Sequence, residues 1–475
     1  MVVENSVITS FLWKAGERIL VQGVGLVIQI ILARLLLPED FAAIALITAI
    51  VNYLGLFVQS GLSVAVVQKK DLKEKDIATL TTISLFVATI LFIALFIAAP
   101  FVSDFYNVGN LVWPIRVMGL SLFLYSFNSI QTGLLSRKMM FRTVFIRSLI
   151  ATPLSGMVGI TMAYIGMGIW ALVGYNITNI LSIVIFMSMM PELRLKLGGS
   201  VKSAKELYSF SLKILGTSLI SAGGDTIRTM TIGKFFSPEK LAYYDRSYSY
   251  SSLVTQVVNV SLSSVLLPVF SRNQENNCQL KSLARRSVGV STFIMIPVLV
   301  GVAIVSEPLI RILLTDKWIA CAPFLSLFCL LRIPGIITSI DKQVYLSLGK
   351  SQIGLYYEIS LLAANLLCLV LMIPYGVFAI ALGYTLVEYI GNFLLCIISS
   401  RMYGYSLKER ISDLIKPLFS SILMALCGYV LTFTSLSTWM LFISQVFVCS
   451  SVYIILQILI KDSNLQYIIQ KVDNR

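Results

Sequence analysis

Stretches of about 20 apolar residues, separated by short polar segments, follow one another along almost the whole chain. A helix needs roughly 20 predominantly apolar residues to cross the hydrocarbon core of a bilayer. The pattern predicts an all-α integral membrane protein with about 14 transmembrane helices. The first, seventh, eighth and tenth stretches are unusually polar, so a count of 12 stays open if one pair does not span. The predicted spans are 11–33, 41–66, 77–102, 111–136, 143–166, 168–190, 209–233, 241–270, 286–311, 318–340, 353–373, 377–399, 411–434 and 438–460.

Composition excludes several other classes of protein. Of the 475 residues, 57% are hydrophobic and 13% are charged, whereas soluble globular chains carry roughly 25% charged residues. The chain has no histidine, which removes imidazole bases and histidine metal sites. Its seven cysteines include no Cys-x-x-Cys pair, so a metal or disulfide framework is not expected. We therefore expect no cofactor, no metal and no enzymatic activity.

The basic residues predict the orientation in the membrane. If the N-terminus is cytoplasmic, 28 of the 37 Lys and Arg residues lie on the cytoplasmic side, and only five lie in the loops of the opposite side. Such asymmetry is the signature of cytoplasmic loops. It predicts cytoplasmic N- and C-termini, and it explains most of the net charge of +14 without a nucleic-acid partner. The outer loops are short, which weakens an alternative as a membrane polymerase or ligase.

Weak internal similarity suggests that the chain is duplicated. Arg34-Leu-Leu-Leu-Pro-Glu recurs 200 residues later as Lys234-Phe-Phe-Ser-Pro-Glu, and Ala171-Leu-Val-Gly-Tyr is echoed by Ile380-Ala-Leu-Gly-Tyr. An offset of six spans makes the repeats parallel, an arrangement found in transporters with a cavity between two lobes. We expect a six-helix lobe over 1–190, a cytoplasmic linker over 191–208, a second six-helix lobe over 209–400, and helices 13 and 14 with a tail over 401–475.

A few charged residues lie inside the predicted spans, where topology does not explain them. An arginine at a helix centre costs about 2.5–3.5 kcal/mol on insertion scales. Asp225 is three residues before Arg228 and is expected to pair with it on one helix face. The pair is either a local salt bridge or part of a site. Apart from the basic residues near span ends, the arginines inside spans are Arg116, Arg228, Arg246 and Arg332.

The eighth span begins with an unusually polar segment, Tyr243-Tyr-Asp-Arg-Ser-Tyr-Ser-Tyr-Ser-Ser. Tyrosines near a membrane boundary form interfacial belts, but the interleaved serines and Arg246 make a cavity wall an equal alternative. On that interpretation, Tyr244, Tyr248 and Tyr250 would line a path for a glycan.

The first span also carries charge, with Lys14, Glu17 and Arg18 on one helix face, either as an ion pair at the cytoplasmic helix entrance or as the lower rim of the cavity. Cations at the helix entrance favour an anionic ligand, and phosphate is the obvious candidate because it accepts charge-assisted hydrogen bonds. Carboxylates inside the spans are few. Of these, Glu388 in the twelfth span and Asp225 are candidates for proton coupling.

Two segments near the start carry a resemblance to a known family. Ser10-Phe-Leu-Trp-Lys-Ala-Gly-Glu-Arg18 and Ala33-Arg-Leu-Leu-Leu-Pro-Glu-Asp-Phe41 resemble the polysaccharide exporters that include colanic acid and teichuronic acid exporters. That group belongs to the superfamily of multidrug, oligosaccharidyl-lipid and polysaccharide exporters. In the related lipid II flippases, arginines on the first and eighth helices face the cavity, and Arg18 and Arg246 would be their counterparts by position.

The resemblance implies a function in the synthesis of surface polysaccharide, lipopolysaccharide or O-antigen. The protein would flip an undecaprenyl-diphosphate-linked oligosaccharide from the cytoplasmic to the outer leaflet of a bacterial inner membrane. Its partners would be that lipid-linked substrate, membrane lipids and other glycan-assembly proteins. The diphosphate would bind to Lys14, Arg18, Arg228, Arg246 and Arg332. A multidrug or small-solute exporter of the same superfamily is the alternative.

Overall fold

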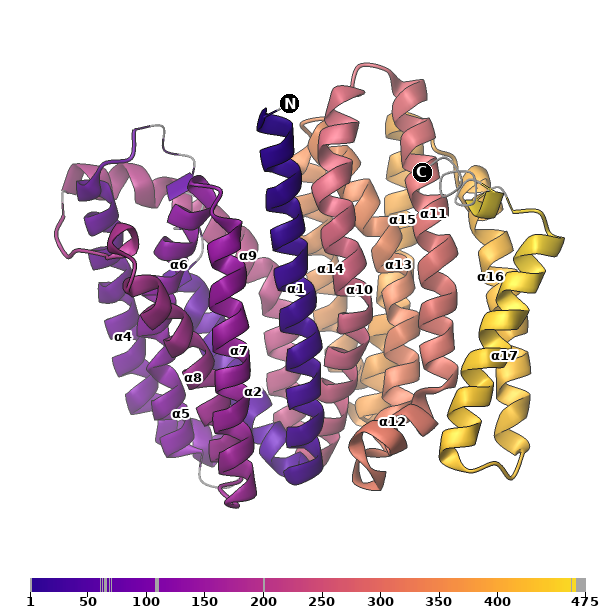
Figure 1. The fold of residues 1–475 in the computed structure, drawn as a ribbon, viewed down its shortest axis with the longest axis horizontal. Coiled ribbons are helices and arrows are strands. Elements are labelled where there is room, and N and C mark those ends of the chain that lie inside the picture. The colour runs from indigo at the N-terminus through magenta and orange to yellow at the C-terminus, as the bar shows by residue number, and fades with distance from the viewer. Residues whose placement is uncertain are drawn as a thin grey trace. The chain divides into compact units, whose positions relative to one another are not determined.

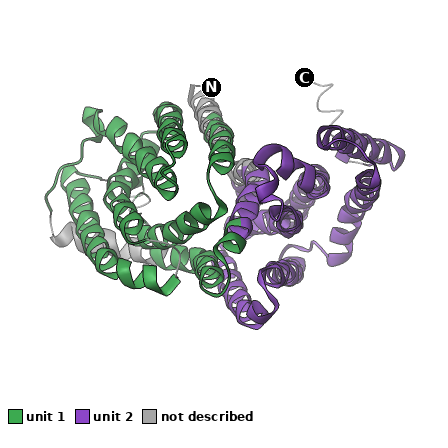
Figure 2. Cartoon of the chain, turned by 90° about the horizontal axis from the view of Figure 1, so that it is seen from below, with its two compact units in different colours: residues 1–242 green, residues 243–475 purple. Residues whose placement is uncertain are grey.

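The computed structural model consists of α-helices joined by short loops, and its described residues form no strand. The described backbone covers 2–59, 61, 63, 66–67, 69, 71–106, 111–199, 201–462 and 464–466. Within these ranges, the side chains of 2–15, 17–19, 201–214 and 257–265 are outside the description. The chain divides into two compact units, 1–242 and 243–475 (Figure 2).

Unit 1 is a bundle of long helices. Its α7 packs against α1 and α8, and its α2 packs against α6, α8 and α9. A hydrophobic core cluster of this unit includes the buried residues Val66, Ile130, Met187 and Leu193. The helices of this unit are α1 (Val2–Leu35), α2 (Pro38–Gln59), α4 (Glu74–Tyr106), α5 (Val112–Gly119), α6 (Ser121–Arg137), α7 (Phe141–Tyr164), α8 (Ile169–Ser188), α9 (Val201–Phe235) and the start of α10 (Pro238–Arg272).

Unit 2 is organised around α13. This helix packs against α11 and α15, while α14 packs on α15 and the last two helices pack on each other and on α11 (Figure 1). Buried side chains such as Phe270, Ile340 and Tyr345 form its core. Besides the rest of α10, the unit contains α11 (Asn277–Ile304), α12 (Ser306–Leu314), α13 (Cys321–Ser347), α14 (Ser351–Met372), α15 (Val377–Tyr403), α16 (Leu407–Val430) and α17 (Thr438–Leu459).

Within the described part of the chain, ten helical segments are long and apolar enough to cross a membrane. They correspond to α2, α4, α7, α8, α11 and α13 to α17, so the predicted class of all-α, multi-pass membrane protein is confirmed. The first, seventh and eighth predicted spans form the more polar helices α1, α9 and α10. The fourth predicted span is divided into α5 and α6 at Leu120, a break that hydropathy does not register.

The two sequence motifs that are 200 residues apart have the same local structure. The first helix of each motif ends at Leu35 or Phe235, and the next begins at Pro38 or Pro238. Proline is favoured at the first helical position because its missing N–H is not needed there. Each motif therefore forms the same proline-initiated connection between two long helices.

The two glycines of the second repeated motif also serve one purpose. At Gly174 on α8, an added Cβ would collide with the Sδ of Met162 on α7, and at Gly383 on α15 it would collide with the Sγ of Cys368 on α14. Small residues let membrane helices approach closely. The same close helix pair thus occurs once in each unit.

Candidate functional site

Arg332 is a partly buried arginine of unit 2 without a described carboxylate partner. It lies on α13, its guanidinium carbon is 4.4 Å from the centre of the Tyr248 ring, and its Nη2 donates a long 3.4 Å hydrogen bond to the Tyr248 carbonyl. Its buried Nε makes no hydrogen bond to any described residue. Within the described part of the chain no carboxylate lies within 4.0 Å of it. A cation of this kind in a membrane helix is a functional-site candidate.

Arg246 lies on α10 in the same unit but is compensated. Its Nη2 donates to the Oδ2 of the adjacent Asp245 at 2.8 Å, and only 14% of its side chain is exposed. The hydroxyl of Tyr250, four residues further along α10, is also buried. An anionic ligand at Arg246 would have to compete with, or bind beside, a neighbouring carboxylate.

The three predicted glycan-lining tyrosines do not share one surface. Tyr244 is 2% exposed and packs edge-on against Phe324 and Phe328, with ring centroids 6.0 and 4.9 Å away. It is therefore a core residue of unit 2 in this structure, because its ring fills the space between α10 and α13. Tyr248 and Tyr250 are partly exposed, and Tyr248 also supports Arg332.

The predicted pair on α9 forms in unit 1. The Nη2 of Arg228 is 2.9 Å from the Oδ1 of Asp225, with 5% of the arginine side chain and 59% of the aspartate side chain exposed. The spacing of three residues on one helix face therefore predicted the contact correctly. Glu388 is half-buried on α15. The side chains of Lys14 and Arg18, both predicted to bind the diphosphate, lie outside the described residues.

Arg116, the remaining arginine inside a predicted span, lies near the end of α5. Its guanidinium carbon is 4.0 Å from the centre of the Phe96 ring and 5.2 Å from that of Trp113, and its Nε donates to the Phe96 carbonyl at 3.3 Å. The two rings therefore hold the cation by cation–π contacts.

Arg410 is one of the 28 basic residues predicted to lie on the cytoplasmic side, and the sequence gives no sign that it pairs with the buried Asp341. Its two Nη atoms donate to Asp341 at 2.8 and 3.0 Å, and the two side chains are 3% and 0% exposed. Tyr403 donates to Asp341 and accepts from Arg410. Bidentate pairing with every oxygen engaged is the arrangement that a buried ion pair needs. The cluster joins α13, α15 and α16.

A second ion pair reinforces this attachment of α16. The guanidinium of Arg285 on α11 donates two 2.7 Å hydrogen bonds to Asp413, which also accepts from Tyr405 at 2.9 Å. The first turn of α16 is fixed by a capping box between Ser406 and Glu409. The N-terminal end of α16 is therefore firmly held to the rest of unit 2.

Arg147 is also one of the 28 basic residues predicted to lie on the cytoplasmic side, yet its side chain is buried in unit 1. Its Nη1 donates to Thr132 and Asn128 at 3.2 and 3.4 Å and contacts the Met187 sulfur at 2.9 Å. The sequence signal was weak, because Arg147 lies only four residues after the start of the predicted fifth span.

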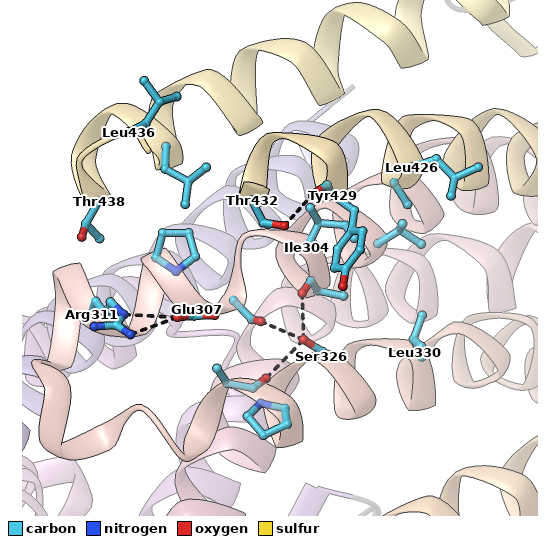
Figure 3. A pocket seen from close by; sticks show the side chains of 18 of the residues that line it. Ile304, Glu307, Arg311, Ser326, Leu330, Leu426, Tyr429, Thr432, Leu436 and Thr438 are labelled. Atoms are coloured by element: carbon cyan, nitrogen blue, oxygen red, sulfur yellow. Dashed lines mark hydrogen bonds and ion pairs between the residues drawn. The ribbon is translucent and has the colours of Figure 1, made fainter. Parts of the chain in front are cut away.

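At the opposite end of α16, a cavity of about 870 Å³ lies between the last two helices, α16 and α17, and the helices α11, α12 and α13. Figure 3 shows Arg311 at its edge, pointing toward Glu307. Arg311 donates to Glu307 at 3.0 Å and to Asp316 at 2.8 Å, and Ser326 bonds to Ser306 within the cavity wall. Two carboxylates neutralise the arginine, so this cavity does not offer the charge that a diphosphate requires.

Comparison with known proteins gives the family. A model of the family described as "Polysaccharide biosynthesis protein" matches residues 31–323, more than half of the chain. The teichuronic acid biosynthesis protein TuaB of Bacillus subtilis is 21% identical over 80% of this chain and 78% of its own. The lipopolysaccharide biosynthesis protein WzxC of Escherichia coli is 20% identical over 91% of this chain and 88% of its own.

The fold is that of a known flippase. The inward closed conformation of the lipid II flippase MurJ superimposes with a TM-score of 0.79 and 16% sequence identity, covering 96% of this chain and 99% of MurJ. The predicted exporter group is confirmed by the match of family and fold together. The chain belongs to the polysaccharide biosynthesis protein family, a family of multi-pass membrane transporters and not of enzymes.

Proposed function

We propose that this protein flips an undecaprenyl-diphosphate-linked oligosaccharide from the cytoplasmic to the outer leaflet by alternating access. The names of its relatives support a glycan product, since one acts in teichuronic acid and one in lipopolysaccharide biosynthesis. The fold of a lipid II flippase supports a lipid-linked substrate.

The observation that carries the proposal is the environment of Arg332. A guanidinium in an apolar helix, over the Tyr248 ring and without a carboxylate among the described residues, has its hydrogen-bonding capacity only partly used. A diphosphate would complete it with charge-assisted hydrogen bonds. The cost of about 2.5–3.5 kcal/mol for placing an arginine in a membrane helix is then offset when substrate is bound.

The other proposed contacts differ in how far their charges are already paired. Arg246 would assist beside Asp245, and Arg228 would assist while paired with Asp225. On the first helix, Lys14 and Arg18 would meet the substrate at the cytoplasmic entrance. Tyr248 and Tyr250 would contact the glycan, while Tyr244 would support them from the core. Glu388 and Asp225 remain proposed coupling residues.

The proposed working parts are two parallel six-helix lobes, 1–190 and 209–400, with 14 spans in total and both termini in the cytoplasm of a bacterial cell. The linker 191–208 joins the lobes, and 401–475 adds the last two helices and the tail. With an inside-negative potential, each negative charge carried outward gains about 2.3 kcal/mol per 100 mV. Membrane potential should therefore bias export of the diphosphate.

The experiment is deletion of the gene, followed by measurement of surface glycan and of lipid-linked intermediates on the cytoplasmic leaflet. We expect glycan to fall and the intermediates to accumulate, and wild-type protein to reverse both changes. In vesicles, collapsing the membrane potential should slow flipping. Intact surface glycan together with new drug sensitivity would instead indicate a multidrug exporter.

A further inference from the structure

The helix that carries Arg332 contains a built-in break. Pro334 lies inside α13 and has no backbone N–H, so the carbonyl of Leu330, four residues earlier, loses its helical hydrogen-bond donor. In a membrane such a carbonyl must find another partner, because no water is present to replace the donor. Proline is tolerated in membrane helices where a neighbouring helix supplies that partner.

In this protein the partner comes from α15. The hydroxyl of Tyr389 donates to the Leu330 carbonyl at 3.0 Å. Asn392, almost one turn further along α15, donates its Nδ2 to the Thr338 Oγ1 at 2.9 Å and to the Pro334 carbonyl at 3.3 Å. Two side chains of one helix therefore hold the broken turn of α13 on both sides of the proline.

Arg332 lies inside that broken turn, between Leu330 and Pro334. Its guanidinium has no described ion-pair partner to fix it, only the ring and the carbonyl of Tyr248. The backbone of the turn therefore determines where the charge is presented. A shift of this turn would move the guanidinium relative to a bound phosphate.

We infer that Tyr389 and Asn392 are positioning residues that hold the broken turn of α13 so that Arg332 meets the anionic group of the substrate. The inference rests on the proposed role of Arg332 as an anion-binding residue. Tyr389 does not contact the substrate in this scheme, and its hydroxyl stands in for the N–H that Pro334 lacks.

The test compares Tyr389→Phe with wild type in two measurements on the full-length protein. Hydrogen exchange of the amides between Leu330 and Thr338 reports on the turn, and flipping of a lipid-linked oligosaccharide in proteoliposomes reports on function. One lost hydrogen bond corresponds to roughly a 2- to 10-fold effect. We expect faster exchange and a 2- to 10-fold higher half-saturating substrate concentration, with little change in maximal rate.

Two further variants make the test specific. In a Pro334→Ala background the helical N–H is restored, so Tyr389→Phe should have no additional effect on either measurement. Tyr356→Phe is the matched control, because Tyr356 lies on the neighbouring α14 and is 67% exposed, and it should behave as wild type.

Three outcomes would overturn the inference: unchanged exchange in Tyr389→Phe, faster exchange without any change in half-saturation, or an equal effect in the presence and absence of Pro334. Failure of the proposed function looks different. In that case Arg332→Met itself would flip substrate normally, whatever the exchange data show.

Discussion

Two arginines of unit 2 differ in the groups that surround their positive charge. Arg410 is 3% exposed and forms a bidentate pair with Asp341, which is completely buried, and it also contacts Tyr403. Arg332 stacks on Tyr248 and has no carboxylate within 4.0 Å among the described residues. The charge of Arg410 is neutralised within the protein and stabilises the fold, whereas the charge of Arg332 has no described counter-ion and is available to an anionic ligand. The number of cations inside a transporter is therefore less informative than the state of their partners.

The largest effect on stability should come from Arg410→Met. The substitution leaves Asp341 buried without its cation, and breaking a buried ion pair in this way costs about 3–5 kcal/mol. The measurement is the melting temperature of the purified protein in detergent. Arg311→Met is the matched control, since Arg311 is 42% exposed and exposed pairs contribute about 0–1 kcal/mol. Equal melting temperatures for the two variants would remove the distinction between the clusters.

Arg332→Met should have the opposite profile. It removes a charge that contributes no ion pair to the fold, so the melting temperature should stay at or above that of wild type. Export should fall about 10- to 100-fold, which corresponds to the loss of one or two hydrogen bonds to a charged group. Surface glycan in a deletion strain that expresses the variant provides the measurement. A large drop in melting temperature would mean that Arg332 is structural.

A smaller effect is expected when the whole buried cluster is replaced. In the combination Asp341→Leu, Tyr403→Phe and Arg410→Met, no polar group is left without a partner, and apolar replacements of buried ion pairs are often neutral or stabilising. The triple variant should recover most of the stability that Arg410→Met loses. A triple variant as unstable as the single one would indicate that the cluster does more than satisfy its own charges.

The smallest effect should come from an exposed ion pair between Lys138, at the end of α6, and Glu192 in the short 3-10 helix Pro191–Leu193. The Lys138 ammonium donates a 2.6 Å hydrogen bond to Glu192 and thereby lowers the pKa of that carboxyl. Because the pKa is lower in the folded state, the pair stabilises the protein above the unfolded pKa of glutamate, about 4.3. This contribution disappears as the pH falls through the folded pKa.

Lys138→Ala should therefore lower the melting temperature only slightly near neutral pH, and not at all in acid. Added salt should remove the difference, since it screens exposed charges. The Arg410 cluster should be insensitive to salt over the same range. A salt-dependent effect of Arg410→Met would contradict its burial.

The sequence predicts best what depends on local pattern. The ranges 168–190, 377–399 and 438–460 agree closely with α8, α15 and α17, because an apolar run of this length is visible without knowledge of its neighbours. Arg332 was recognisable for the same reason, as a charge inside such a run. The pairing of Asp225 with Arg228 follows from helical spacing alone.

What depends on distant residues was beyond the sequence. Arg410 and Asp341 are 69 residues apart, and no local signal connects them. Similarly, the donor that compensates Pro334 comes from Tyr389 on another helix, and no local pattern around the proline indicates it. Tyr244 lies one helical turn before Tyr248, which alternates with serines, yet its ring packs against the aromatic rings of α13 in the core.

The central claim, that Arg332 is kept without a carboxylate in order to bind the diphosphate, can be tested directly by titration calorimetry. The measurement is the binding of undecaprenyl diphosphate to purified wild type and to Arg332→Met, with melting temperatures recorded for both. We predict binding to the wild type and a loss of at least about tenfold in affinity for a variant that remains folded. Equal affinity of two folded proteins would contradict the claim and assign the diphosphate to other residues.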